Sequence, residues 1–437
     1  MKFSKNVCVI GMWHLGCVTA GCLANIGNRV TCFDFDTKLI DDLEKGKLPI
    51  YEPGLKELFT ECVAGNKLHF SLDLKNTIPT SEYVYITFDT PVDDNDRIDL
   101  SIIHRTVDSI IPLLSKDAVI VISSQVPVSA CDLILKKIRR AGKRNELCYS
   151  PENLRLGNAI DSFMKPERLV FGLSSFAIKE RIQELFSGID ANYLFMDLKS
   201  AEMTKHALNS YLATLISFSG EISDLCEKTG ANAIEVMNAL KTEKRVSSYA
   251  PIMPGLGFAG GTLARDVQIL RELGHKTNTR TDVLDAVLSV NTQRMKYISN
   301  KLLSLFGSLN RKRIAFFGLT YKADTNTLRR SPALQVIDQI KDTNVIIQAY
   351  DPMIKEQIEN YEHITICKSA EKAAAGSDAL IIITDWDEFK NIDYIRIAEF
   401  MRNPTIIDTK NMLDANKFKG TNIRYYGIGV VSEDEIE

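Results

Sequence analysis

The sequence lacks the features that mark several protein classes. Its nine cysteines stand singly and none belongs to a C-x-x-C pair, so neither a disulfide framework nor a cysteine-based zinc site is expected. It has no excess of one charge, since 53 Lys and Arg are set against 56 Asp and Glu. The net charge of -3 therefore supplies no basic field for nucleic acid or anionic lipid. The 6 histidines show no paired ligand spacing, which leaves a metal site unsupported.

The sequence also lacks a long hydrophobic run. The longest apolar stretches, such as residues 379–383, fall well short of the ~20 residues that cross a bilayer. The start of the chain could be interpreted as a lipoprotein signal, because lysines precede an apolar stretch and a small residue precedes Cys22. Gly11, Trp13 and His14 interrupt that stretch, and a strand-turn-helix unit explains the same residues better. With its cysteines single, we expect a cytoplasmic protein without membrane contact.

The composition is that of a folded protein with several cores. Apolar residues make up 45% and charged residues 25%, which excludes disordered, collagen-like and coiled-coil chains. A length of 437 residues predicts two to three domains at roughly 150 residues each. Small-molecule chemistry is therefore the default function to consider.

The N-terminal part has the pattern of a dinucleotide-binding unit. An apolar run at 6–10 ends at Gly11, a helical pattern follows over about 15–26, and a second apolar run at 29–33 ends at Asp34. Further strands are expected at 83–88, 118–122 and 169–172. The alternation of strands and helices predicts an α/β fold with a doubly wound parallel sheet, over a first domain of residues 1–199.

The pattern changes after residue 200 and then returns. Residues 200–228 contain no proline and have apolar residues at helical spacing, which predicts one long helix. Helical segments continue to about 306, so residues 200–306 are interpreted as a helical connector and dimerisation domain. Strand patterns at 313–318 and 345–351 then repeat the first unit, which predicts a second Rossmann-like domain over 307–437. Two such halves suggest that two nucleotide-bearing molecules meet in the cleft between them.

Several strings in the chain are unusual in their order and spacing. Residues 49–55 read P-I-Y-E-P-G-L, 126–128 read V-P-V, and 150–155 read S-P-E-N-L-R. The remaining strings are A-E-M with Lys205 and Asn209, G-L-T-Y-K at 318–322 with Arg329 and S-P at 331–332, and A-Y-D-P at 349–352. Together they resemble the UDP-glucose/GDP-mannose dehydrogenases over nearly the whole chain.

The resemblance implies an activity and a set of catalytic residues. Members of this family oxidise the C6 hydroxymethyl group of a nucleotide sugar to a carboxylate with NAD, and they commonly supply polysaccharide biosynthesis. By the same resemblance, Lys205 and Asn209 contact the reacting end of the sugar, and on a helix their spacing of four makes them face the same way. Glu152 corresponds to a glutamate near the reacting carbon, and Asp266 to an aspartate that positions water.

The segment at 257–267 departs from the family at the covalent nucleophile. The family reads G-F-G-G-S-C-F-P-K-D-V, whereas this chain reads G-F-A-G-G-T-L-A-R-D-V, so Thr262 stands at the position of the cysteine. A thiolate traps the intermediate aldehyde, while a threonine hydroxyl ionises far less readily. We therefore expect single or transient hydride transfer, for example epimerisation. A four-electron 6-dehydrogenase that uses a route without cysteine and a non-catalytic nucleotide-sugar-binding protein remain alternatives.

Other departures lie in or near the expected site. Gln125 replaces a threonine of S-T-V-P-V, Leu156 an acid of L-R-E-G, and Lys410 an arginine of D-G-R-N, while Arg265 replaces a lysine. The glycine fingerprint G-x-G-x-x-G is also altered, because Trp13 occupies the middle position and could either stack beside the cofactor or block it. His14 could contact a phosphate. The predicted NAD-binding residues are Gly11, Trp13, His14, Leu15, Gly16, Asp34, Thr90, Ser124 and Arg329.

The resemblance also implies the partners. The predicted substrate-binding residues are Asn153, Leu154, Arg245, Tyr249, Gly257, Phe258, Lys322 and Lys410. Arg245 matches an arginine that in the family reaches the sugar of a neighbouring subunit. We therefore expect a homodimer formed through the central helix, with a UDP-hexose as the substrate and no nucleic acid partner.

Overall fold

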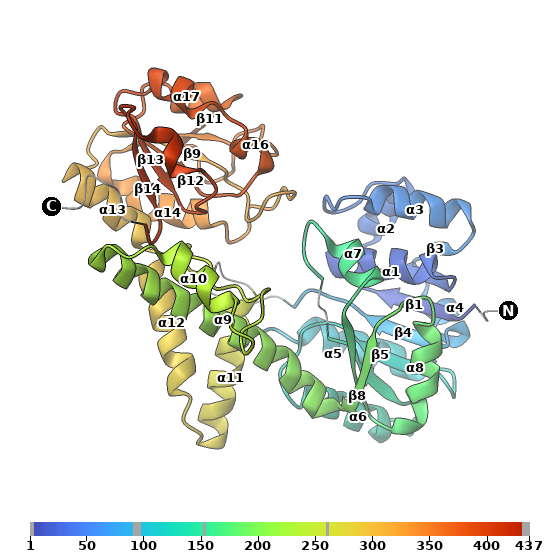
Figure 1. Ribbon diagram of the computed structural model, residues 1–437. Helices are drawn as coiled ribbons and strands as arrows, with labels where there is room; N and C mark the ends of the chain where they lie inside the picture. Colours follow the sequence, from blue (N-terminus) through green and yellow to red (C-terminus); the bar gives the residue numbers. More distant parts are fainter. Residues whose placement is uncertain (1–3, 91–97, 152–153, 259–261, 431–437) are drawn as a thin grey trace. The chain divides into compact units, whose positions relative to one another are not determined.

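The computed structural model describes residues 4–90, 98–151, 154–258 and 262–430. The chain forms two compact units, Met1–Ala207 and Leu208–Glu437, and each is described by itself (Figure 1). Among the described helices, none is both long and apolar enough to span a membrane.

The described part of the first unit forms one eight-stranded sheet in the order β3-β2-β1-β4-β5-β6-β7-β8. Its strands are β1 (Asn6–Ile10), β2 (Arg29–Phe33), β3 (Leu68–Ser71), β4 (Tyr83–Ile86), β5 (Val119–Ile122), β6 (Leu147–Tyr149), β7 (Arg168–Leu173) and β8 (Asn192–Asp197). The central strands β4 and β5 are buried along their whole length, as apolar runs in a sheet covered on both faces must be.

Helices cover both faces of this sheet. They are α1 (His14–Asn25), α2 (Thr37–Glu44), α3 (Leu55–Ala64), α4 (Leu74–Thr77), α5 (Ser101–Ile110), α6 (Ala130–Arg140), α7 (Ala159–Met164) and α8 (Lys179–Leu185). Helices α1, α3, α7 and α8 pack on one face, and α5, α6 and the start of the next helix pack on the other. The strands and the helix predicted at the N-terminus are therefore confirmed, and the segment interpreted as a possible lipoprotein signal forms β1 and α1.

One strand pair departs from the parallel arrangement. Strand β7, predicted at 169–172, runs antiparallel to β6, while all other neighbouring pairs of this sheet are parallel. A parallel return needs a crossover, usually a helix of several turns across a face of the sheet. The described part of the β6–β7 connection contains only the six-residue α7, and the strand returns in the opposite direction.

The second unit begins within the longest helix. Its helices before the second sheet are α9 (Leu198–Thr229, shared with the first unit), α10 (Ala233–Lys241), α11 (Leu263–Thr277), α12 (Asp282–Arg294) and α13 (Tyr297–Phe306). The long helix predicted over 200–228 is confirmed as α9. Helices α11 and α12 lie side by side in Figure 1 and share a small apolar core with α9.

The rest of the second unit is a second Rossmann-like sheet. Its six described strands are parallel throughout, in the order β11-β10-β9-β12-β13-β14. They are β9 (Arg313–Phe317), β10 (Ile346–Tyr350), β11 (Ile364–Ile366), β12 (Ala379–Ile382), β13 (Thr405–Asp408) and β14 (Arg424–Gly427). The helices are α14 (Pro332–Ile340), α15 (Ala370–Ala374), α16 (Asp387–Lys390) and α17 (Tyr394–Phe400). Helices α13 and α14 pack on one face, and α15 to α17 on the other.

Candidate active site

The carboxyl ends of β1, β4, β5 and β6 meet at one edge of the first sheet, since these strands are parallel. The chain order reverses between β1 and β4, and ligands of open α/β sheets bind outside such a switch point. Gly11 follows β1, and the turn at 123–126 follows β5. Most of the predicted cofactor contacts are therefore brought to this edge.

The glycine-rich loop connects β1 to α1. Gly11 has a φ of +101°, and a Cβ placed on it would lie 2.9 Å from the ring of Phe88. A Cβ on Gly16 would lie 1.8 Å from the carbonyl oxygen of Gly11, so only glycine fits. Trp13 has extended backbone angles, φ -82° and ψ -156°, that any residue adopts. Trp13 is 46% exposed as a residue, and its backbone angles show no distortion of the loop.

Asp34 lies at the end of β2 beside this loop. Its carboxylate accepts hydrogen bonds from the backbone N–H groups of Met12, at 2.7 Å, and Asp36, at 3.0 Å. An acid in this position suits a ribose hydroxyl, and the N-terminus of α1 suits a pyrophosphate. The residues present therefore fit a dinucleotide such as NAD.

His14, the first residue of α1, contacts a buried glutamate. Its Nε2 lies 2.8 Å from Oε2 of Glu52, whose side chain is fully buried. The same carboxylate accepts hydrogen bonds from the N–H groups of Gly157, at 2.9 Å, and Ala159, at 2.8 Å. Burial alone would raise the pKa of Glu52, but the hydrogen bonds from His14, Ala159 and Gly157 bring that pKa below its ordinary value. The structure thus gives His14 a carboxylate partner, and its contact with a phosphate stays a prediction.

A second buried glutamate caps α6. Glu202 on α9 accepts hydrogen bonds from the N–H groups of Ser129, at 2.6 Å, and Cys131, at 2.8 Å. Burial raises the pKa of this carboxyl group, and these backbone donors only partly offset that effect. One turn further along α9, Nε2 of His206 lies 2.9 Å from the carbonyl oxygen of Val126. Both contacts fix the V-P-V turn against α9.

Thr90 and Ser124 lie after β4 and β5, and both are buried. The Thr90 hydroxyl donates to the carbonyl oxygen of Gln125 at 3.1 Å, and the Ser124 hydroxyl donates to that of Ile86 at 3.4 Å. These two hydroxyl groups therefore stabilise the turn at 123–126, which lies at the edge of the sheet where the cofactor contacts are predicted.

The predicted catalytic residues on α9 are buried. Lys205 is 6% exposed and Asn209 is 5% exposed, and both lie on this one helix. The Asn209 amide donates a short hydrogen bond to the carboxylate of Asp266, which is buried in the first turn of α11. The structure thus joins two residues that were predicted separately for the site, and their roles toward the sugar and water stay predictions.

Thr262 occupies the N-cap position of α11. It is exposed, and its hydroxyl makes no capping hydrogen bond to the helix backbone. The carbonyl oxygen of Thr262 accepts the N–H of Asp266 at 3.2 Å, which places the two residues in the same turn. The N-terminus of a helix carries a partial positive charge and favours an anion at this point.

The C-terminal end of α12 holds the loop that leads to Thr262. The Arg294 guanidinium donates to the carbonyl oxygen of Gly255, at 3.1 Å from Nε and 3.0 Å from Nη2. The Asn291 amide donates to the carbonyl oxygen of Phe258 at 3.1 Å. A Cβ on Gly257 would lie 2.2 Å from the Asn291 side chain, so a larger residue here would displace that amide. Gly257 and Phe258, predicted substrate contacts, are thus held in a defined backbone conformation.

The predicted basic residues of the second sheet lie on its surface. Lys322 and Arg329 belong to the long connection from β9 to α14, and Lys410 follows β13; all three are exposed. The carboxylate of Asp408 accepts the N–H groups of Lys410, Met412 and Leu413 and so shapes the turn that carries Lys410.

Two predicted substrate contacts are not brought to a site within one unit. The Arg245 side chain is 87% exposed and pairs with Glu243 at 2.9 Å, and Tyr249 is 89% exposed. Glu152 and Asn153 lie outside the described residues, and Leu154 borders them, half-buried. In the portion that the structure describes, no cluster of His, Cys, Asp and Glu has the arrangement of a metal site.

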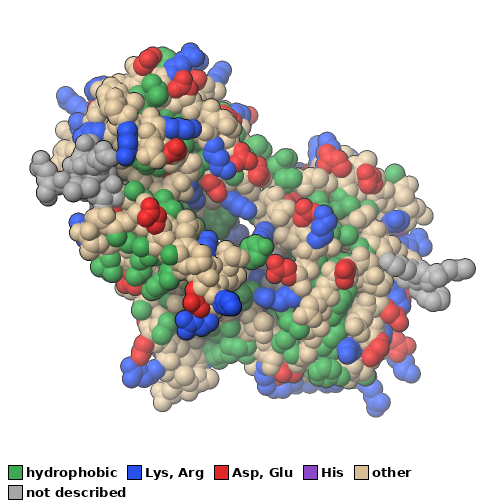
Figure 2. Space-filling view, viewed as in Figure 1, with side chains coloured by type: hydrophobic (Ala, Val, Ile, Leu, Met, Phe, Trp, Pro, Cys, Tyr) green, Lys and Arg blue, Asp and Glu red, His purple; other side chains and the backbone are tan. Residues whose placement is uncertain are grey.

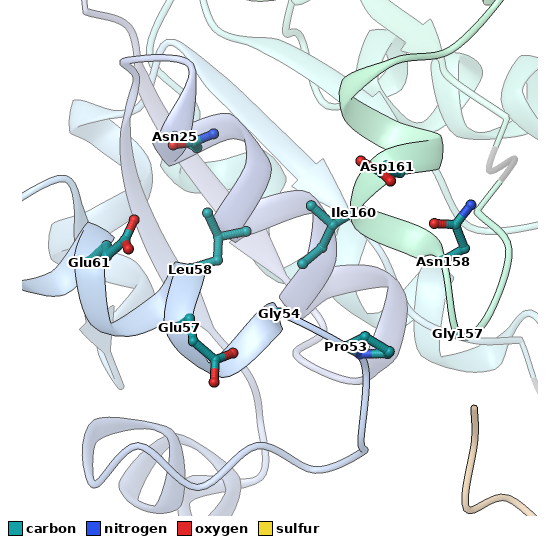
Figure 3. A pocket seen from close by; sticks show the side chains of 10 residues that line it. All are labelled: Asn25, Pro53, Gly54, Glu57, Leu58, Glu61, Gly157, Asn158, Ile160 and Asp161. Atoms are coloured by element: carbon teal, nitrogen blue, oxygen red, sulfur yellow. The ribbon is translucent and has the colours of Figure 1, made fainter.

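A hollow of about 440 Å³ lies beside the Glu52 contacts in the first unit. It is lined by Asn25, Pro53, Gly54, Glu57, Leu58, Glu61, Gly157, Asn158, Ile160 and Asp161. Figure 3 shows Leu58 on α3 and Ile160 on α7 pointing toward each other. Gly54, with a φ of +76°, is the N-cap of α3 and explains the P-G pair of the 49–55 string.

Family models match all three parts of the chain. The NAD binding domain of the UDP-glucose/GDP-mannose dehydrogenase family matches residues 5–190, its central domain 199–293, and its UDP binding domain 315–415. The chain belongs to this family. It therefore carries the NAD-binding and UDP-binding domains of an NAD-dependent nucleotide-sugar dehydrogenase, and the predicted cofactor and enzyme class are confirmed.

Individual relatives of this family member agree. The chain is similar to a UDP-glucose 6-dehydrogenase of Rickettsia bellii, at 33% identity over 97% of this chain and 99% of the relative. It is 32% identical to UDP-glucose 6-dehydrogenase TuaD of Bacillus subtilis, over 97% and 93% of the two chains. The fold matches that of a UDP-glucose dehydrogenase from Pyrobaculum islandicum with a TM-score of 0.89, at 24% identity and over 98% and 99% of the two chains.

Sequence reasoning missed the residues that position the site of this dehydrogenase-family chain. Glu52, Glu202 and Asp351 lie within strings that carry the resemblance but had no predicted role, and Arg294 lies in none of them. Asp351 follows β10 and accepts hydrogen bonds from the N–H groups of Leu319 and Thr320. Glu52 and Asp351 stand beside proline and apolar residues, and an ionisable residue in such a stretch is buried only with partners. That signal marks them as important, but it does not name the partners.

Proposed function

We propose that this chain oxidises the primary alcohol of a UDP-hexose with NAD and stops after one hydride. The observation that carries the proposal is Thr262 at the N-cap of α11, in the same turn as the buried Asp266. Oxidation of the alcohol removes one hydride, which NAD takes up when it is bound, and one proton from the hydroxyl group. The product is then an aldehyde.

The three domains divide the work in this proposal. Residues 1–199 hold NAD, with Gly11, Gly16 and Asp34 at the loop and β2. Residues 307–437 hold the UDP group, with Lys322 and Lys410 as exposed cations suited to phosphate. Residues 200–306 contribute the catalytic face of α9 and the subunit interface.

Lys205 and Asn209 support the chemical step. A buried ammonium group stabilises negative charge on the alcohol oxygen far more than an exposed one would, because water screens it less. The Asp266 carboxylate accepts one N–H of the Asn209 amide and fixes its orientation, which leaves the rest of the amide for the substrate oxygen. Glu152, if it lies near the reacting carbon, is the candidate to receive the proton.

The second oxidation step is the one that Thr262 impairs. A cysteine at a helix N-terminus has a lowered pKa and offers a thiolate that adds to the aldehyde. A threonine hydroxyl at the same place stays protonated, and removing its proton needs a strong base nearby. Without the covalent adduct, the aldehyde is released or takes a hydride back from NADH and returns to the primary alcohol. An epimer would form only if a ring alcohol, not the primary alcohol, lost the hydride to NAD and the resulting ketone took it back on its other face.

The test is the ratio of NADH formed to sugar consumed. Wild-type protein with NAD and UDP-glucose is expected to form one NADH and an aldehyde, with products identified by mass spectrometry. Thr262→Cys is expected to move the ratio toward two with an acid product, and Thr262→Ser is the matched control that stays at one.

Each other outcome favours a named alternative. Two NADH and an acid from the wild-type protein would overturn the single-hydride version and favour a four-electron route without cysteine. An epimer without net NADH would favour transient hydride transfer. Binding of both ligands with no turnover, while a cysteine-bearing relative reacts in the same assay, would favour a binding protein.

We also propose a homodimer formed through α9. Tyr211, Phe218 and Leu225 are spaced seven apart on this helix and are 61%, 46% and 60% exposed, so they form an apolar stripe on one face. Exposed Arg245 and Tyr249 are then available to a neighbouring subunit. Light scattering of Phe218→Asp against wild type tests this, and an unchanged dimer mass would contradict it. The nine unpaired cysteines support a cytoplasmic location.

A further inference from the structure

Glu52 joins three segments that are far apart in the sequence. Its Oε2 atom contacts both Nε2 of His14 and the N–H of Gly157, and its Oε1 atom accepts the N–H of Ala159. An ionised carboxylate only accepts hydrogen bonds, so the Nε2 atom of His14 carries the proton and donates it. One buried group therefore connects the start of α1 to the loop at 154–159.

The two connected segments serve different ligands. His14 follows the glycine-rich loop directly and begins the helix whose N-terminus suits a pyrophosphate. The 154–159 loop continues the S-P-E-N-L-R segment, in which the family resemblance predicts Glu152 near the reacting carbon and Asn153 and Leu154 at the substrate. A movement of either segment changes the contacts of the same carboxylate.

The capping of α7 by Glu52 does not require His14. Glu202 caps α6 in the same way, with two backbone N–H groups and no histidine or other cationic side chain among its hydrogen-bond donors. The His14 contact is therefore an addition to a sufficient cap, and what it adds is the connection to the dinucleotide loop. His14 is itself only 13% exposed in its side chain, so water competes weakly for the bond.

We propose that His14 and Glu52 are positioning residues that couple the binding of the dinucleotide to the binding of the nucleotide sugar. Binding of the first ligand orders the glycine-rich loop, and through Glu52 it orders the 154–159 loop. The second ligand then meets a loop that is already ordered and loses less conformational entropy on binding. This inference rests on the proposed function, since it requires both ligands.

The test measures linkage between two binding equilibria without turnover. NADH fluorescence gives the Kd for NADH with and without UDP-glucose, a pair that cannot react because both are reduced. In wild-type protein, saturating UDP-glucose is expected to tighten NADH binding at least about fivefold. In His14→Phe, which keeps a ring but has no donor, the ratio is expected to fall to nearly one.

Two further variants separate the contact from a general loss of structure. His14→Gln restores an N–H donor, so it is expected to recover most of the coupling. His69→Phe is the matched control in the same unit. The ring of His69, in β3, contacts the carbonyl oxygen of Asn66 just before that strand, and this variant is expected to keep the full ratio. If the Phe variant does not fold, His14→Asn replaces it, since its shorter amide does not reach Glu52.

The outcomes distinguish this inference from the proposed function. A wild-type protein that binds both probes without coupling overturns the inference alone, and so does a His14→Phe variant that keeps the wild-type ratio. A wild-type protein that binds neither probe overturns the proposed function together with the inference. Recovery of the coupling in His14→Gln supports it.

Discussion

The two sheets share one strand order around their first strand, but they use the acid at the end of the second strand differently. In the first sheet, Asp34 is half-buried and accepts hydrogen bonds from the N–H groups of Met12 and Asp36. In the second sheet, Asp351 is fully buried and accepts five hydrogen bonds, from Leu319, Thr320 (its N–H and its hydroxyl), Met353 and Trp386. The carboxylate of Asp34 is partly exposed and suits a ribose hydroxyl, whereas the carboxylate of Asp351 is buried and hydrogen-bonded to other residues of the same domain.

The segment between the first strand and the next helix also differs between the two sheets. In the first sheet, α1 begins at His14, directly after the glycine-rich loop that starts at Gly11. In the second sheet, α14 begins only at Pro332, far beyond Gly318. The intervening loop carries Lys322 and Arg329, so cations take the place of a helix N-terminus near the glycine. A duplicated topology thus serves two ligands because the loops changed while the strands did not.

The strongest test of this comparison exchanges each acid for alanine. Asp351→Ala leaves several buried donors unsatisfied and is expected to lower the free energy of unfolding by at least about 3 kcal/mol. Asp34→Ala is expected to lower it by about 1 kcal/mol or less, yet to weaken NADH binding at least about tenfold. Urea unfolding and NADH titration measure the two effects. Equal losses of stability would break the comparison.

The contact between α1 and its loop gives the next effect. Gly16→Ala forces a Cβ against the Gly11 backbone, and we expect a loss of about 2 kcal/mol together with loss of NADH binding. Gly21→Ala, on the same helix, meets only the side chains of Leu58 and Phe59, which can move. This control is expected to stay within about 1 kcal/mol of wild type and to bind NADH normally. Thermal unfolding and the same titration report both variants.

A pH series compares buried carboxylates of the two units. The pKa of Glu52 is lowered, so its stabilising contribution is present above the ordinary glutamate pKa and is lost as the pH falls through the lower value. Burial raises the pKa of Asp408, so its folded form takes up a proton first and gains stability as the pH falls. The stability gap between wild type and Glu52→Gln should therefore shrink as the pH falls below the ordinary glutamate pKa, while the gap to Asp408→Asn should grow as the pH falls through the raised pKa of Asp408. Gaps that change in the same direction would contradict this assignment.

The smallest effect concerns the two tryptophans, one in each unit. Trp13 is 46% exposed, and Trp386 is 8% exposed and donates to Asp351. Trp386→Phe leaves Trp13 as the remaining tryptophan, and Trp13→Phe leaves Trp386. Acrylamide should quench the fluorescence of the first variant several-fold more than that of the second. Bound NAD should protect Trp13, and not Trp386, from this quenching. Trp13→Gly is expected to change stability by less than about 0.5 kcal/mol. An indole that NAD does not protect would place the dinucleotide away from this loop.

Charged side chains of the two signs are not separated into large patches on the face that Figure 2 shows. On the face drawn in Figure 2, acidic and basic side chains are intermixed over both units. This distribution agrees with the nearly balanced composition, and it is consistent with sites for small nucleotides formed by a few named cations.

Much of the fold followed from local pattern. Buried strands such as β5 are short apolar runs bounded by polar residues, and α9 is a long run without proline, so both were found at nearly their observed bounds. The antiparallel direction of β7 was not found, because a strand's own residues do not encode the direction of its neighbour. Strand pairing is decided by the connection and by the whole sheet.

Some features of the candidate site could likewise be predicted from local sequence, and others could not. Residue identity and spacing along one segment were enough for the fold class, the glycine positions at 11 and 16, the acid at 34, and the prediction that Thr262 stands at the position of the family's cysteine. Three contacts became visible only in the folded chain. Glu52 bonds both His14 and the backbone of 157–159, and Asp266 accepts a hydrogen bond from Asn209. Asp351 accepts hydrogen bonds from the loop that follows β9. Hydrogen bonds between segments distant in the chain depend on where the folded backbone places their donors and acceptors, and that information is not local to any one stretch of sequence.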